Sequence, residues 1–156
     1  MQLTRCTDYA LRVLIYAGMH EQRLVTIPEI AQAFGISYNH LVKVVHRLAS
    51  AGYLESTRGK HGGIRLGRPP QAIGLGEVVR HMEIHLAIAE CFDAHTCSCR
   101  ITTACLLRQV LREAALAFHE VLNRYTLANL LENRSSLQDL LLPSPQSPAS
   151  VSGTPT

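Results

Sequence analysis

Four of the five cysteines in this 156-residue chain lie within fifteen consecutive positions. Seven residues separate Cys91 from Cys99, five separate Cys99 from Cys105, Cys97 stands two before Cys99, and Cys6 lies apart near the N-terminus. A secreted disulfide framework spreads an even number of cysteines along the chain, and a zinc ribbon uses paired CxxC motifs; neither pattern is present here. Clustered thiolates are ligands for zinc or for an iron–sulfur cluster. The segment is therefore predicted to bind metal.

Two short helices joined by a glycine turn are predicted upstream of the cysteines. Thr26 and Glu29 form a capping-box pattern that starts a helix over 27–34, and Gly35 ends it. The segment 38–50 has one apolar stripe and a polar opposite face. Such a pair is typical of a helix-turn-helix, whose second helix enters the DNA major groove, although a solvated polar face would show the same pattern. The expected DNA contacts of the second helix are Tyr38, Asn39, His40, Lys43 and Arg47.

A basic, glycine-rich β-hairpin is predicted to follow, with strands at 53–57 and 64–66. A phosphate-binding loop would need a GxxxxGK[ST] motif and a following helix, and neither occurs here. A helix-turn-helix followed by such a hairpin is a winged helix, so residues 1–68 are predicted to be a DNA-binding domain. They hold nine Lys and Arg against four Asp and Glu, which suits a polyanion. The hairpin residues expected to contact DNA are Arg58, Lys60, His61 and Arg65.

The rest of the chain is predicted to form three parts. Residues 69–102 hold a linker helix and the cysteine loop, and residues 103–132 hold a long helix and a short C-terminal helix. Residues 133–156 are predicted to be a disordered tail, because they are rich in Pro, Ser and Thr. The long helix has a heptad-like apolar stripe; it either packs on its own domain or, as we predict, pairs with its twin in a homodimer. The predicted fold class is mainly α with a small β-wing: a winged helix-turn-helix plus a long dimerisation helix.

Several classes of protein are excluded by what the sequence lacks. No run of eighteen apolar residues is present, and the N-terminus carries Arg5, Asp8 and Arg12 where a secretory signal would be apolar. We therefore predict a cytoplasmic protein without a membrane partner. No nucleophile–base pair or substrate-pocket signature is recognisable, so the chain is predicted not to be an enzyme.

The sequence resembles the IscR/NsrR family of iron–sulfur winged-helix regulators over residues 1–142. The resemblance is carried by TDYALR in the first helix, SYNHLVKVVHRLASAGYL in the second helix of the helix-turn-helix, TRGKHGGIRLG in the hairpin, CRITTAC before the long helix and YTLANLL at 125–131. Within that family the chain is most similar to the nitric-oxide-sensitive repressors. The implied function is a homodimeric repressor that nitric oxide releases from double-stranded DNA, so that nitric oxide detoxification genes are derepressed.

The resemblance also implies a ligand set. Cys91, Cys99 and Cys105 are the implied cluster ligands, and Cys97 departs from the family pattern as an alternative to Cys99. Asp8 matches a carboxylate that some members donate from the partner subunit; a helix-capping role is its alternative. Three cysteines and one other ligand fit either a 2Fe–2S or a 4Fe–4S cluster.

Two other functions remain open at this point. One is a regulator of the same family that responds to iron–sulfur supply or redox state, which the extra Cys97 favours. The other is an iron–sulfur or zinc carrier or redox protein, which would leave the basic hairpin unexplained.

Overall fold

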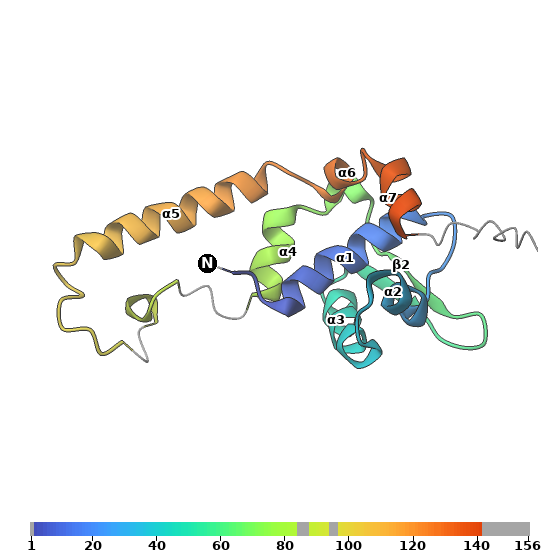
Figure 1. Ribbon diagram of the computed structural model, residues 1–156, viewed down its shortest axis with the longest axis horizontal. Helices are drawn as coiled ribbons and strands as arrows, with labels where there is room; N and C mark the ends of the chain where they lie inside the picture. Colours follow the sequence, from blue (N-terminus) through green and yellow to red (C-terminus); the bar gives the residue numbers. More distant parts are fainter. Residues whose placement is uncertain (1, 84–87, 94–96, 142–156) are drawn as a thin grey trace, which may run out of the picture.

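The computed structural model describes residues 2–83, 88–93 and 97–141. Within these ranges the helices are α1 (Arg5–Met19), α2 (Ile27–Phe34), α3 (Tyr38–Ser50), α4 (Leu75–Met82), α5 (Leu106–Asn123), α6 (Leu127–Leu130) and α7 (Arg134–Leu141). The remaining elements are the strands β1 (Leu54–Thr57) and β2 (Gly63–Leu66) and the 3-10 turns η1 (Pro70–Ala72) and η2 (Glu90–Phe92). The predicted fold class, a mainly helical winged helix-turn-helix with a long additional helix, is confirmed (Figure 1).

Helix α1 is the centre of the winged domain. Its N-terminus is capped by Thr4, whose hydroxyl accepts a hydrogen bond from the backbone N–H of Thr7 at 3.3 Å. Because α3, α4, α6 and β2 pack around it, α1 is buried on more than one side, which is why its apolar residues do not form a single stripe. Its buried apolar residues are Ala10, Val13, Leu14, Tyr16, Ala17 and Met19.

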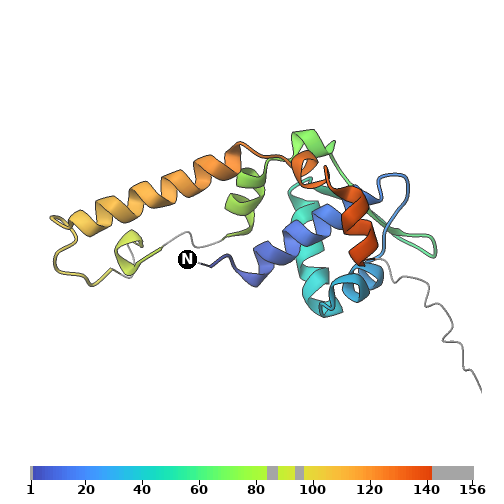
Figure 2. The same ribbon diagram turned by 45° about the horizontal axis from the view of Figure 1, so that its top comes forward.

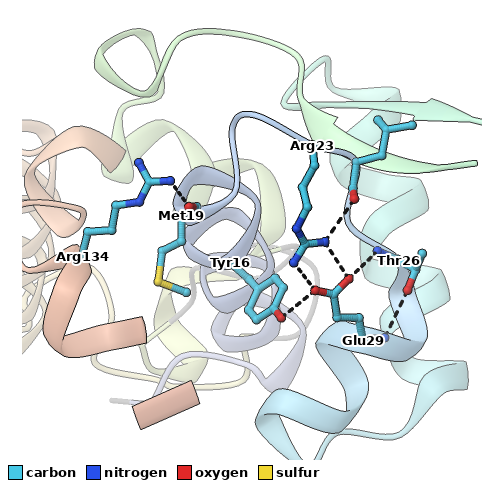
Figure 3. Close-up of polar contacts among 7 residues, drawn as sticks. Tyr16, Met19, Arg23, Thr26, Glu29 and Arg134 are labelled. Atoms are coloured by element: carbon cyan, nitrogen blue, oxygen red, sulfur yellow. Dashed lines mark hydrogen bonds and ion pairs between the residues drawn. The ribbon is translucent and has the colours of Figure 1, made fainter. Parts of the chain in front are cut away.

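The helix-turn-helix forms for the local reasons that the sequence indicates. Thr26 and Glu29 make both hydrogen bonds of the capping box, and Gly35 ends α2 with a φ of 62°. Ser37 precedes α3, and its side chain makes no capping hydrogen bond. Figure 3 shows that Glu29 also accepts hydrogen bonds from Tyr16 of α1 and from Arg23, which fixes the start of α2 on α1.

The hairpin is held to the rest of the domain as well as to itself. Its strands pair from Leu54↔Leu66 to Thr57↔Gly63. Ile64 also exchanges two backbone hydrogen bonds of 2.8 and 2.9 Å with Val25, which precedes α2. Because a side chain at Gly63 would come within 2.8 Å of the Val25 carbonyl oxygen, glycine is needed for this close approach.

The core of the winged domain extends beyond residue 68, where the sequence analysis placed its end. Ile73, Val78, Met82 and Leu127 belong to the same buried cluster as α1 and α3. The tail prediction for 133–156 is also wrong in part: α7 occupies 134–141, its Leu137 and Leu141 pack against the core, and Arg134 donates to the Met19 carbonyl oxygen (Figure 3). Residues 142–156 lie outside the described residues.

Helix α5 projects from the winged domain, and its C-terminal end is anchored there (Figures 1 and 2). Leu75 at the start of α4 donates to the Tyr125 carbonyl oxygen at 3.0 Å, and Leu127 donates to the Ile73 carbonyl oxygen at 2.8 Å. The cysteine segment lies at the opposite, free end of α5, whereas the hairpin lies at the far end of the molecule. No helix in the described ranges combines the length and apolar character needed to cross a membrane.

Candidate DNA-binding surface and cysteine segment

Helix α3 presents its polar face to solvent. Leu41, Val44, Val45 and Leu48 are buried, which fixes the orientation of the helix. Four of the side chains predicted to contact DNA are consequently exposed: Tyr38, Asn39, His40 and Lys43. Asn, Lys and His side chains on an exposed helix are suited to hydrogen bonding with base edges and phosphates.

The tip of the hairpin carries exposed cations. Arg58, Lys60 and His61 are all exposed, and Gly59 between them has a φ of 110°. The fourth predicted hairpin residue, Arg65, forms an ion pair with Glu55 on the opposite strand, with contacts of 2.7 and 2.9 Å. Both side chains are more than half exposed, so this pair contributes little to stability and competes weakly with a phosphate.

Arg47 differs from the other residues predicted to contact DNA. Its guanidinium extends toward the C-terminal end of α4, where it donates to the His81 carbonyl oxygen at 3.0 Å and to the Met82 carbonyl oxygen at 3.3 Å. It also donates to the sulfur of Cys6 at 3.3 Å. The DNA contact predicted for Arg47 stays a prediction. In this structure the side chain joins α3 to two other helices, because acceptors on α4 and α1 lie within its reach.

A groove of about 210 Å³ opens between α1 and α3, beside the exposed face of α3. Arg5 and Tyr9 of α1 line it, together with His40 and Lys43 of α3. Arg5 and Tyr9 were not among the predicted DNA contacts, because the many apolar residues of α1 are typical of a mostly buried helix. Arg5 adds a cation next to Lys43 on this side of the domain.

Asp8 lies in the first half of α1 and forms an ion pair with Arg12, one turn further on, at 2.8 Å. The two side chains are 44% and 42% exposed, respectively, so the carboxylate remains accessible to a second partner. Thr4, not Asp8, is the residue that caps α1.

The cysteine segment runs from η2 to the start of α5. Cys91 lies in η2, Cys105 directly precedes α5, and Cys99 is exposed between them. The Cys97 sulfur is 3.3 Å from the hydroxyl oxygen of Thr102. Over the parts of the chain that the structure describes, no three Cys, His, Asp or Glu side chains converge as the ligands of a metal ion.

A carboxylate links the start of this segment to its middle. Glu90 accepts hydrogen bonds from the backbone N–H of Ser98 at 2.5 Å and from its hydroxyl at 2.6 Å. These bonds lower the pKa of the Glu90 carboxyl, because they stabilise its charged form. Since Glu90 adjoins Cys91 and Ser98 lies between Cys97 and Cys99, the contact joins the part of the loop that holds Cys91 to the part that holds Cys97 and Cys99.

The donor set suits an iron–sulfur cluster in its chemistry. All five cysteines are free thiols, and none belongs to the buried core. Soft thiolate sulfur is the ligand that iron–sulfur clusters use. A cavity of about 250 Å³ beside Cys105 is lined by Arg108 and Arg112. The residues therefore fit such a cluster, provided that the loop draws the thiols together around it.

Comparison with known proteins extends this assignment. A family model described as Rrf2, iron-dependent transcriptional regulator, matches residues 3–133. The chain is 51% identical to the HTH-type transcriptional regulator NsrR of Geobacillus kaustophilus (strain HTA426) and 49% identical to the HTH-type transcriptional regulator NsrR of Bacillus subtilis (strain 168). Each alignment spans 142 residues, covering 90% of this chain and 97% of the relative. The solved structure of T. potens IscR is similar in fold, with a TM-score of 0.70 and 24% identity, over 88% of this chain and 91% of that chain.

Proposed function

We propose that this chain is a repressor that responds to nitric oxide through an iron–sulfur cluster. The chain belongs to the Rrf2 family of iron-dependent transcriptional regulators, and it is therefore a DNA-binding regulator and not an enzyme. The observation that carries this proposal is the segment of free thiols between η2 and α5, attached to a winged helix-turn-helix. The nitric oxide signal rests on the sequence resemblance to nitric-oxide-sensitive repressors and on relatives named NsrR. We place its action in the cytoplasm, where thiols stay reduced.

The proposed cluster ligands are Cys91, Cys99 and Cys105, with Asp8 of the partner subunit as the fourth. Cys99 is favoured over Cys97 because Cys99 is exposed, whereas the Cys97 sulfur lies against the hydroxyl of Thr102. When bound, the cluster supplies iron that reacts with nitric oxide. Arg108 and Arg112 place positive charge beside Cys105, and Glu90 holds η2 close to residues 97–99 through Ser98.

The proposed dimer forms through α5. Its side chains include large apolar residues that no part of the described chain covers: Leu107 is 63% exposed, Val110 is 60% exposed and Val121 is 47% exposed. Exposed apolar residues repeated along an isolated helix are expected to pair with a second copy. A two-fold dimer would present two copies of α3 to DNA half-sites about 34 Å apart.

The proposed DNA contacts come from α3 and the hairpin. Tyr38, Asn39, His40 and Lys43 would read the major groove, while the exposed cations Arg58, Lys60 and His61 would contact phosphate or the minor groove. Arg65 would join them by exchanging its Glu55 partner for a phosphate.

The proposed response is a shift between two dimer arrangements. Asp8 is on α1, at the centre of the winged domain, so a bond from this carboxylate to the partner's cysteine loop would fix how the two winged domains are spaced. Loss of that bond would let Asp8 return to its ion pair with Arg12. A hundredfold fall in DNA affinity requires about 2.7 kcal/mol of coupling between cluster state and dimer arrangement.

Anaerobic purification followed by nitric oxide titration tests the proposal. The visible absorption spectrum and the binding of duplex DNA from upstream of the chain's own gene would be followed in the same samples. A brown chromophore that bleaches as DNA binding is lost supports the proposal. DNA binding that is unchanged by nitric oxide, or a colourless zinc-containing protein, contradicts it.

Single cysteine variants separate the ligands from the bystanders. Cys91→Ala and Cys105→Ala are expected to abolish the chromophore and to weaken DNA binding. Cys99→Ala is expected to do the same, while Cys97→Ala serves as the matched control and retains the cluster. The reverse result for the last two variants would make Cys97 the middle ligand.

A second function is favoured by the additional thiol. Cys97 is half-buried and close to Thr102, in a loop that already holds three proposed ligands. A regulator that responds to redox state could use such a thiol. This second function would be favoured if oxidants release DNA from the wild-type protein but not from Cys97→Ala, and nitric oxide releases DNA from neither.

A further inference from the structure

The polar contacts of Arg47 connect the recognition helix to the end of α4. The guanidinium donates to the carbonyl oxygens of His81 and Met82, which belong to the last turn of α4. The last carbonyls of a helix have no partner within it, and a cation at this end is favoured by the helix dipole. Arg47, from α3, therefore caps the C-terminus of α4 across the domain.

The same helix end is attached to α1 by a second contact. Glu83, the residue that follows α4, is only 8% exposed. Its carboxylate accepts a hydrogen bond from the backbone N–H of Thr4 at 2.7 Å and one from the Thr4 hydroxyl at 3.2 Å. Arg47 in turn donates to Cys6 of α1. The start of α1, the final turns of α3 and the end of α4 thus meet at one polar junction.

This junction is also the point from which the chain leaves the winged domain toward the cysteines. Cys91 follows Glu83 by eight residues. The C-terminal end of α5 is attached to α4 separately, by the hydrogen bonds from Leu75 to the Tyr125 carbonyl oxygen and from Arg80 to the Asn123 side chain. Along the chain, the cysteine loop is therefore connected to the winged domain at the C-terminal end of α4, to which Arg47 of α3 is hydrogen-bonded.

We propose that Arg47 is a positioning residue that makes the setting of the recognition helix depend on the state of the cysteine loop. This inference rests on the proposed function. It assigns to Arg47 the relay of a displacement, and it leaves the phosphate and base contacts to Lys43 and its neighbours. Lys43, one turn earlier on the same helix, is exposed and lines the groove facing Arg5, which makes it a matched control.

The two roles of Arg47, relay and DNA contact, predict different results in a comparison of cluster-loaded and chelator-treated protein. A DNA contact contributes in both states, so its loss would lower both affinities equally and reduce the salt dependence by about one phosphate contact. A relay contributes to the ratio of the two affinities, and its loss leaves the salt dependence unchanged.

The experiment measures DNA affinity in both states for the wild-type protein, Arg47→Lys, Arg47→Gln and Lys43→Gln, using the duplex from upstream of the chain's own gene. Lysine keeps the charge but lacks the planar fork that reaches several acceptors, so Arg47→Lys keeps any simple phosphate contact. We expect wild-type protein to bind DNA about a hundredfold more tightly when it is cluster-loaded than when it is chelator-treated. In both Arg47 variants this ratio of affinities should be smaller by about tenfold or more. Lys43→Gln is expected to weaken both states equally and to keep the ratio.

The outcomes distinguish this inference from the function on which it rests. If wild-type protein shows the same affinity in both states, the proposed function fails, and the relay fails with it. If wild-type protein shows the ratio and folded Arg47→Lys retains it in full, only the relay is overturned. Circular dichroism and the unfolding midpoint of each variant establish that it is folded, and the conservative Arg47→Lys protects the test against a misfolded Arg47→Gln.

Discussion

The hydroxyl of Tyr16 donates a 3.0 Å hydrogen bond to the carboxylate of Glu29, which joins α1 to the first turn of α2. The same carboxylate accepts from Arg23 and from the backbone N–H of Thr26 (Figure 3). These hydrogen bonds, with that from Arg23 the largest cause, lower the pKa of Glu29 to about 2. One carboxylate therefore sets the position of the helix-turn-helix on α1, and its charge is needed for that role.

The contribution of Glu29 to stability is expected to disappear in acid. Its pKa is lowered from 4.5 to about 2 on folding, so the contribution is fully present above pH 4.5 and is lost as the pH falls toward 2. Glu29→Gln keeps the capping box but removes the charge. We expect it to lower the free energy of unfolding by about 0.5–1 kcal/mol at neutral pH, because the pair with Arg23 is partly exposed.

Chemical denaturation at several pH values measures this effect. The difference between the wild-type protein and Glu29→Gln should shrink below pH 4.5, whereas Glu21→Gln, an exposed neighbour, should show no difference at neutral pH. A difference that stays constant down to pH 2.5 would contradict the role given to the Glu29 charge.

The packing of α5 on α4 is expected to require glycine at position 76. A Cβ at this position would lie 2.0 Å from the Asn123 side-chain oxygen, which also accepts a 2.9 Å hydrogen bond from Arg80. Gly76→Ala must therefore displace Asn123, at a cost of about 1–3 kcal/mol. Thermal unfolding measures this loss of stability. Gly74→Ser is the control, because its Cβ would meet only Glu77, at 3.9 Å.

A double substitution tests the cause of that loss. If the clash with Asn123 is responsible, Asn123→Ala should restore much of the stability of Gly76→Ala. An equally unstable double variant would show that the α4–α5 contact is strained by something other than this side chain.

A negative charge on the apolar face of α5 is expected to break the proposed dimer. Val110 is 60% exposed in the single chain, and Val110→Glu would bury an unpaired charge in a paired α5. We expect the dimer dissociation constant to rise by about a hundredfold or more, which is about 2.7 kcal/mol. Sedimentation velocity measures it. Gln109→Glu adds the same charge to the adjacent residue and should leave the dimer intact; equal effects of the two would speak against the apolar stripe.

Loss of the Glu90–Ser98 contact is expected to weaken retention of the cluster. Ser98→Ala removes the 2.6 Å hydroxyl bond without touching a proposed ligand. Groups that orient metal ligands typically contribute about 10–100-fold to metal affinity. The iron content and visible absorbance after dialysis against a chelator should fall more quickly than for the wild-type protein, while Ser136→Ala in α7 should behave like the wild type. Unchanged retention in Ser98→Ala would mean that Glu90 has no part in assembling the site.

Much of the winged domain could be predicted from local patterns. The capping box at Thr26 and Glu29, the glycine at 35 and the apolar stripe of 38–50 determine where α2 and α3 begin and end, because caps and periodicity act over a few residues. The chemistry of the cysteine segment also follows from residue type and spacing. The family of iron–sulfur regulators was implied by the resemblance of longer motifs such as TDYALR and CRITTAC.

The last eight described residues show where local patterns stop being sufficient. An eight-residue helix is only marginally stable in isolation, and the polar sequence after residue 132 predicts a disordered tail. Helix α7 forms because Leu137 packs against the core and Arg134 donates a hydrogen bond to the carbonyl oxygen of Met19, more than a hundred residues earlier in the chain.

Arg47 and Lys43 show, within a single helix, the difference between what local sequence predicts and what tertiary packing determines. Four residues apart, they lie on one helical face, so the sequence alone determined that both are cations of the recognition helix and predicted one role for both. Only the tertiary structure decided their partners within the chain: Arg47 donates to the carbonyl oxygens of His81 and Met82, and no such acceptor is hydrogen-bonded to Lys43 among the described residues. The physical reason is that a helix dictates the direction of its own side chains, whereas their partners are determined by how distant segments pack.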